Sequence, residues 1–160
     1  MKPLAPIIVG APVWIEREWA RGKIDRERVC WVGGLIDQAG YGDGVHSVPI
    51  DASIAHIVAE LNWRGYPTLF CCSGLPEDHL YVEGMPCLNP YILFADLEWD
   101  ALPHSLAPAG TVITWNGKHW AFNSDFEVAR RQWRELATTL GVEFDMGETP
   151  YGAAPRDPVG

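Results

Sequence analysis

The chain has 160 residues, 48% of them hydrophobic and 21% charged, so it has the composition of an ordinary globular protein and the length of a single domain. Its 12 basic and 21 acidic residues give a formal net charge of −9. This balance disfavours nonspecific binding to nucleic acid, because contacts with phosphate need lysines and arginines that displace counterions. An acidic surface would instead attract a cation or a basic partner.

The first predicted element is a hairpin with strands at 12–19 and 24–32. Val29 and Trp31 stand two positions apart there, after the charged run 25–28, and this spacing is typical of a strand with one buried face. A helix over 14–27 is the alternative, since apolar residues within that range also stand four positions apart. We favour the hairpin.

A helix is predicted over about 51–64, because apolar residues recur at helical spacing and Asp51 or Ser53 could cap its first turn. Gly65 stands where a left-handed residue commonly ends a helix. A short buried strand is then predicted at 68–72, and a Ser-Gly turn leads out of it.

The next segments alternate between irregular and regular structure. Residues 75–90 hold three prolines and several acids, which predicts an exposed excursion. A second buried strand is expected at 91–95, followed by an irregular connection at 97–110. The range 111–122 reads as a hairpin, because an Asn-Gly pair at its centre suits a type I′ turn.

A long amphipathic helix is predicted over 124–140, where Ser124 and Glu127 have the spacing of a capping box. A glycine then ends the helix, and residues 142–144 could add an edge strand. The last part of the chain is rich in proline and glycine, which favours a loose terminus.

Together these elements predict an α+β fold. We expect one domain over 1–145, with a mixed or antiparallel sheet packed against two main helices at about 51–64 and 124–140, and a loose tail at 146–160. Three tryptophans fall on apolar faces and are predicted to be core residues: Trp115, Trp120 and Trp133.

The sequence also carries expectations about cellular location. No basic and apolar leader follows Met1, and no apolar run approaches 18 residues, so we expect a cytoplasmic protein without a membrane partner. In that compartment its four cysteines would be reduced. They are Cys30, Cys71, Cys72 and Cys87.

The end of the 68–72 strand is the first candidate site, because residues at a strand end beside a glycine turn often border a crevice. Its predicted ligand-binding residues are Cys72, Ser73, Gly74 and His79. Neighbouring residues of a strand point to opposite faces, so at most one of the two cysteines shares a pocket with Ser73. We interpret both cysteines chiefly as packing, and His79 as a solvated side chain in a polar loop.

Neither a metal nor a cofactor is predicted. A zinc site could draw on Cys71 or Cys72 with His79 and Cys87, but this spacing matches no usual pattern of paired ligands. The chain lacks a phosphate-binding glycine loop and a nucleophile elbow. We therefore predict no catalytic residue.

Acidic residues dominate the middle of the chain, where Lys118 is the single base between residues 65 and 124. This segment is the predicted partner-binding surface. Its acids are Glu77, Asp78, Glu83, Asp96, Glu98 and Asp100.

Two stretches carry a family resemblance. The segment 61–74 (LNWRGYPTLFCCSG), followed by 90–94 (PYILF), resembles small uncharacterised phage and bacterial proteins with a Cys-Cys-Ser-Gly strand end. In those proteins a histidine often follows the glycine, where this chain has Leu75. The Cys-Ser-Gly turn is also similar to that of the wybutosine-synthesis methyltransferase family, which implies S-adenosylmethionine and a basic surface for tRNA. The net charge of −9 argues against such a surface.

Two functional hypotheses follow. The first is a non-enzymatic acidic protein of phage or mobile-element origin that binds a basic host protein, such as a nucleic-acid-binding one, as an anti-CRISPR-like or other inhibitor of host defence. The alternative is a protein that binds or modifies a nucleotide-like small molecule at the turn Cys72-Ser73-Gly74.

Overall fold

The computed structural model describes residues 6–18, 24–36, 45–80, 89–95 and 99–144. The predicted α+β class is confirmed, since antiparallel sheets combine with two α-helices. The predicted tail at 146–160 lies outside the described residues. Within the described part of the chain, no helix has the length and apolar character needed to cross a bilayer.

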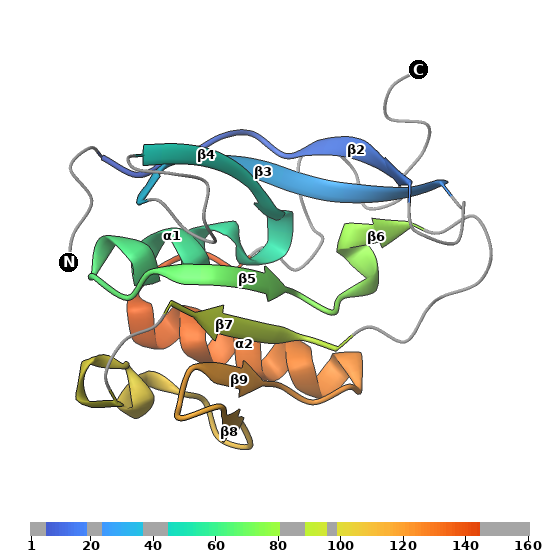
Figure 1. Cartoon of the computed structure of the whole chain (residues 1–160). Helices are drawn as coiled ribbons and strands as arrows, with labels where there is room; N and C mark the ends of the chain where they lie inside the picture. The colour runs from blue at the N-terminus through green and yellow to red at the C-terminus, as the bar shows by residue number, and fades with distance from the viewer. Residues whose placement is uncertain (1–5, 19–23, 37–44, 81–88, 96–98, 145–160) are drawn as a thin grey trace.

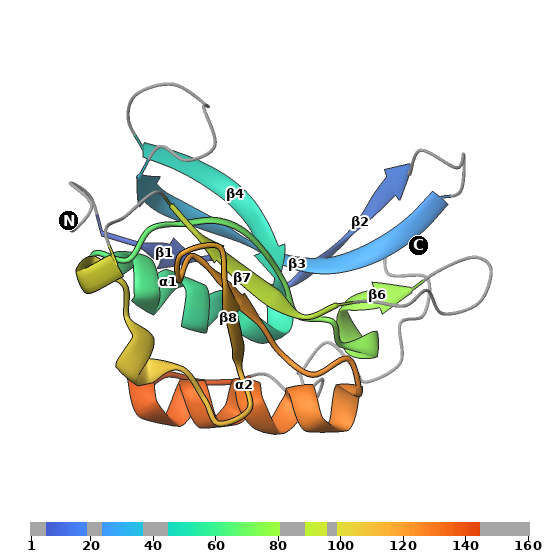
Figure 2. The same cartoon turned by 60° about the horizontal axis from the view of Figure 1, so that its bottom comes forward.

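The strands form two antiparallel sheets (Figures 1 and 2). In sheet A, four strands pair with the long central strand β3, and the five are β1 (Ile8–Val9), β2 (Val13–Glu18), β3 (Ile24–Ile36), β4 (Val45–Asp51) and β6 (His79–Leu80). Sheet B has the order β5 (Thr68–Cys72), β7 (Tyr91–Phe94), β9 (His119–Ala121) and β8 (Val112–Thr114).

Two α-helices and four short 3-10 turns complete the described part of the chain. The helices are α1 (Ala55–Trp63) and α2 (Phe126–Leu140). The 3-10 turns are η1 (Ala52–Ile54), η2 (Pro76–Asp78), η3 (Trp99–Ala101) and η4 (His104–Leu106). Helix α1 contacts β3 and α2, and Figure 1 shows α2 behind sheet B.

One hydrophobic core joins both sheets and both helices. Trp120 of β9 and Trp133 of α2 are fully buried in it, as predicted. Their rings make edge contacts, with 4.9 Å between the ring centroids of Phe94 and Trp120 and 4.4 Å between those of Phe122 and Trp133. Edge-to-face packing of this kind adds about 0.5–1.5 kcal/mol beyond the buried area.

The N-terminal hairpin is confirmed, because β2 pairs with β3 from Val13 opposite Val29 onward. The alternative helix over 14–27 is therefore wrong. Strand β3 continues to Ile36 and also pairs with β1, β4 and β6, which makes it the centre of sheet A.

The start of the first helix differs from the prediction. The chain makes the η1 turn before α1 begins at Ala55, and neither Asp51 nor Ser53 caps through its side chain. Both side chains have tertiary partners instead, as described below. The predicted helix end is confirmed, since Gly65 has a φ of 96° and Tyr66 N donates to Leu61 O at 2.9 Å.

Sheet B agrees with the prediction in its strands and differs in its burial. Residues 68–72 form β5, but Phe70 is 52% exposed, so the strand is not buried throughout. The predicted hairpin at 111–122 is present, and Ile113 lies opposite Trp120 in it. Trp115 has a φ of 54° at the turn and is 67% exposed, so its predicted place in the core is wrong.

Helix α2 is present at the predicted position with a different cap. Asp125, rather than Ser124, accepts hydrogen bonds from Glu127 N and Val128 N. Phe126 therefore lies at the first helical position and is 45% exposed. Gly141 ends the helix with a φ of 73°, and residues 142–144 add no strand.

Candidate functional site

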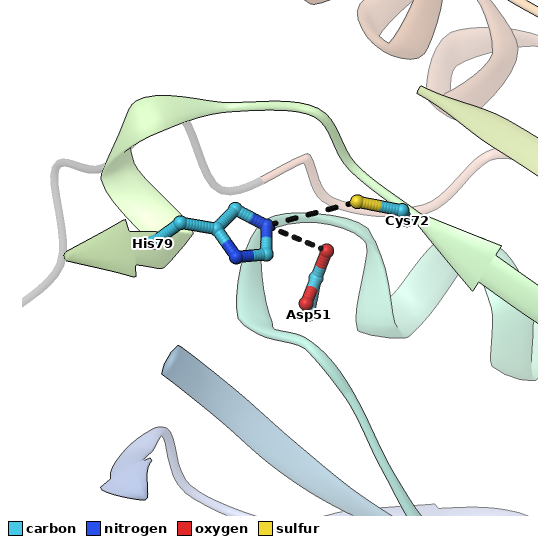
Figure 3. A group of neighbouring side chains, drawn as sticks. All are labelled: Asp51, Cys72 and His79. Atoms are coloured by element: carbon cyan, nitrogen blue, oxygen red, sulfur yellow. Dashed lines mark hydrogen bonds and ion pairs between the residues drawn. The ribbon is translucent and has the colours of Figure 1, made fainter. Parts of the chain in front are cut away.

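Three side chains of different character meet where the two sheets approach each other (Figure 3). Asp51 ends β4, Cys72 ends β5 and His79 begins β6. His79 Nε2 lies 3.2 Å from Asp51 Oδ2 and 3.8 Å from Cys72 Sγ. The three possible ligand atoms all lie within 4.8 Å of one another.

Strand pairing explains why these residues meet. Glu27 lies opposite His79 across β3 and β6, and Val29 lies opposite Asp51 across β3 and β4. Because residues two apart on a strand share a face, Glu27, Asp51 and His79 project from the same face of sheet A. Cys72 reaches them from sheet B.

The turn after β5 is fixed by polar contacts with this face. Ser73 N donates to Asp51 Oδ2 at 2.7 Å, and Leu75 N donates to Ser73 Oγ at 3.2 Å. Gly74 has a φ of 66°, and a Cβ there would lie 2.7 Å from Pro90 Cδ. The turn therefore requires glycine, and the predicted Ser-Gly turn is confirmed.

Beneath this turn lies a buried ion pair. Arg28 donates to Asp78 Oδ1 through Nε at 3.2 Å and through Nη2 at 3.0 Å. Asp78 Oδ2 accepts from Ser73 Oγ at 2.7 Å, and Arg28 also donates to Ser53 Oγ. These contacts hold η2 in place, and the chain enters β6 from there.

The described start of the 75–90 segment is therefore not an exposed excursion. Leu75 and Asp78 are fully buried and His79 is 7% exposed, so the prediction of a solvated His79 is wrong. His79 is buried because β6 pairs with β3, which places this polar stretch within sheet A. Residues 81–88 lie outside the described residues.

The contact between Asp51 and His79 is a buried ion pair. Burial would raise the pKa of Asp51, but the hydrogen bond and positive charge of His79 outweigh it and lower the pKa to about 2. Burial would lower the pKa of His79, but its hydrogen bonds with Asp51 and Cys72 raise the pKa to about 11. At neutral pH the pair is an imidazolium and a carboxylate.

The thiols beside this pair favour their protonated form. Burial is the largest influence on both, and it raises the pKa of Cys72 and, well above 9.0, that of Cys71. The negative charge of Asp51 acts in the same direction. In addition, the same Nε2 of His79 faces Asp51 and Cys72, whereas a catalytic relay uses both ring nitrogens.

From Cys72 an open face extends across sheet B. Cys72 lies opposite Tyr91, and Phe70 lies opposite Leu93, which in turn lies opposite His119. These five residues share the face of sheet B that is turned away from the core residues Ile92 and Trp120. We call this surface the open face of sheet B.

Aromatic rings line the open face. Tyr91 and His119 stack with 5.4 Å between centroids and 21° between planes, and Trp115 lies 5.0 Å from the His119 ring. Burial lowers the pKa of His119, which favours the uncharged imidazole. With the exposed ring of Phe70, these side chains form an apolar surface beside the buried cluster.

The acidic residues predicted to bind a partner are not gathered on one described surface. Asp78 is fully buried, so it does not belong to such a surface. Glu77 binds Arg130 of α2, and Asp100 is exposed. The remaining three, Glu83, Asp96 and Glu98, lie outside the described residues.

A groove of about 320 Å³ lies elsewhere, against α1, and contains none of the predicted site residues. Its lining includes His56, Glu60 and Trp63 of α1 and Val9 of β1.

Of the predicted ligand-binding residues, the structure brings Cys72 and His79 together and places Ser73 and Gly74 in the buried turn between them. The roles of Asp51 and Arg28 were not predicted. Asp51 was expected as a possible helix cap, and Arg28 was not singled out. No known protein family, curated protein or solved structure matches the chain.

Proposed function

We propose that the protein binds a planar, nucleotide-like small molecule on the open face of sheet B, beside Cys72. The observation that carries this proposal is the series of rings formed by Tyr91, His119 and Trp115 on a face that leaves Trp115 67% exposed. Exposed aromatic groups on a sheet are platforms on which bases stack, at about 1–3 kcal/mol per base.

The chemistry of the face favours an uncharged ring over a phosphate chain. The net charge of −9 repels polyanions, and His119 favours its neutral form. Burial raises the pKa of Tyr91, so its hydroxyl stays protonated and can donate a hydrogen bond to a ring nitrogen or carbonyl. A nucleobase or nucleoside therefore suits this surface better than a polynucleotide.

The buried turn Ser73-Gly74 holds the end of β5 in place but does not itself contact the proposed ligand. Ser73 N is already engaged with Asp51, and Ser73 is fully buried, so this turn amide cannot hold a ligand. Of the residues predicted for this strand and turn, we therefore keep Cys72 as a ligand contact, together with the rings of Tyr91, His119 and Trp115.

The test is a binding screen on the untagged chain with nucleobases, nucleosides, nucleotides and S-adenosylmethionine. A ligand at 100 times its Kd should raise the free energy of unfolding by about 2.7 kcal/mol. Trp115→Ala should weaken that ligand by about 1–3 kcal/mol with little effect on stability, because the side chain is exposed.

The matched control is Trp63→Ala. Trp63 is also exposed, at 39%, but lies on α1 in the lining of the separate groove. If no ring compound stabilised the protein, or if the two substitutions weakened binding equally, the proposal would fail.

A second proposal is that the acidic protein binds a basic partner, as an inhibitor of host defence of phage or mobile-element origin. It is supported by the net charge of −9 and by the exposed carboxylate of Asp100. Association driven by such charge slows as ionic strength rises. A pull-down from host lysate, followed by association rates at several salt concentrations, tests it. Capture that does not respond to salt would contradict it.

A further inference from the structure

We propose that Asp51, Cys72 and His79 form a binding site for a transition-metal ion, with Zn²⁺ the ion that suits them. The three residues supply a carboxylate, a thiolate and an imidazole, which are the usual protein ligands of zinc. They come from the ends of three different strands, so the sheets rather than a local loop set their positions.

Two of the three separations between donor atoms agree with tetrahedral coordination, and all three lie within 4.8 Å. Bond lengths of about 2.0–2.2 Å to nitrogen and oxygen and about 2.3 Å to sulfur give separations of about 3.4 Å for N and O and about 3.6 Å for S and N. The structure has 3.2 Å between His79 Nε2 and Asp51 Oδ2, and 3.8 Å between His79 Nε2 and Cys72 Sγ. Both distances lie within a few tenths of an ångström of the expected values.

The direction of the side chains supports the same conclusion. Figure 3 shows the Asp51 carboxylate and the Cys72 sulfur turned toward one nitrogen of His79. A ring nitrogen has one N–H or one lone pair, so Asp51 and Cys72 have to share it. A metal ion among the three atoms would contact all of them.

The surroundings resemble those of established metal sites. Ser73 N donates to Asp51 Oδ2 at 2.7 Å, and Glu27 also makes a side-chain hydrogen bond with Asp51. The buried pair of Arg28 and Asp78 fixes the turn directly before His79. Outer contacts of this kind orient metal ligands and tune their affinity.

The mixed donor set favours Zn²⁺ or Co²⁺ over Mg²⁺ and Ca²⁺, which prefer oxygen ligands alone. The three ligands found among the described residues leave one tetrahedral position for a further ligand, and water in that position would give the coordination of a catalytic zinc site. This site shares Cys72 with the border of the proposed ring site, but its other two ligands, Asp51 and His79, lie in the buried cluster, so metal binding and ring binding are measured separately.

The test is a Co²⁺ titration of the untagged, reduced chain after treatment with EDTA, followed by absorption spectroscopy. We expect one equivalent of Co²⁺ to bind with the visible bands of tetrahedral cobalt and a thiolate charge-transfer band. Zn²⁺ should displace the Co²⁺ and remove both. Asp51→Asn and His79→Gln should weaken the affinity at least tenfold.

Three cysteine variants make the assignment specific. Cys72→Ser should lose the charge-transfer band, whereas Cys71→Ser and Cys87→Ser should keep it. Circular dichroism and the unfolding midpoint show whether each variant is folded, and Zn²⁺ should raise the midpoint of the wild type but not that of Cys72→Ser. Absence of a charge-transfer band in the folded wild type, its survival in Cys72→Ser, or its loss in folded Cys71→Ser or Cys87→Ser would overturn the proposal.

Discussion

The ion pair between Asp51 and His79 predicts a large and pH-dependent loss of stability in Asp51→Asn. The side chains are 3% and 6% exposed, and Nε2 lies 3.2 Å from Oδ2. Removing one partner of a buried pair costs about 3–5 kcal/mol, because the other charge is left without compensation. The amide oxygen of asparagine can still accept from Ser73 N, so the change isolates the charge.

The direction in which the stability difference changes with pH follows from the titration of His79. Its pKa is raised from 6.5 to about 11 in the folded protein, so its stabilising contribution is complete below pH 6.5 and is lost as pH rises toward 11. In Asp51→Asn, burial is the largest remaining influence on His79 and lowers its pKa, opposed by Cys72, so most of this loss above pH 6.5 disappears. The difference in stability between the two proteins should therefore shrink by up to about 1.4 kcal/mol per pH unit between about pH 7 and pH 9.

Urea unfolding monitored by tryptophan fluorescence, in EDTA and a reductant at several pH values, measures this difference. Comparison of variant with wild type cancels the titration of groups shared by both. Asp100→Asn is the control, because Asp100 is exposed and its loss should change stability by less than about 0.5 kcal/mol. A cost below about 1 kcal/mol for Asp51→Asn at pH 7, or a cost that does not shrink as pH rises, would refute the ion pair.

Two further predictions concern the turn and the thiols. Gly141→Ala should cost about 1–2 kcal/mol for its left-handed backbone, since a Cβ there meets nothing within 4 Å. Gly74→Ala should lower the free energy of unfolding by about 1–3 kcal/mol more than Gly141→Ala does, because its Cβ would lie 2.7 Å from Pro90. Equal losses of stability for the two variants in urea unfolding would contradict the packing of the turn. In the metal-free protein, Cys71 and Cys72 should alkylate with iodoacetamide at least tenfold more slowly at neutral pH than in the unfolded chain, because burial raises both pKa values. Site-resolved mass spectrometry measures these rates, and rapid labelling of native Cys72 would show an activated thiol.

Local patterns in the sequence were sufficient for much of the fold. The glycines at 65 and 141 mark the ends of both helices, and the Asn-Gly pair marks the hairpin turn. These features depend on backbone conformations that few residues other than glycine adopt, so they can be recognised without tertiary context.

The site required information that the sequence does not carry locally. β6 has two residues, too few to show a strand pattern, yet its pairing with β3 buries His79. Asp51 has the residue type and position of a helix cap, but contacts with Ser73 and His79 use its carboxylate instead. Arg28 has the sequence pattern of a charged residue on an exposed strand. Its partner Asp78 lies fifty residues later in the chain, so the local sequence does not show the ion pair. Long-range contacts decided each of these positions.

Binding of a ring compound beside Cys72, on the open face of sheet B, is tested most directly by amide and indole resonances of the isotopically labelled chain. The chain is titrated with the nucleoside or base that stabilises it best. We predict saturable shifts at Cys72, Tyr91, His119 and the Trp115 indole, with Trp63 unaffected. Shifts confined to the groove against α1, or no saturable shift with any ring compound, would contradict it.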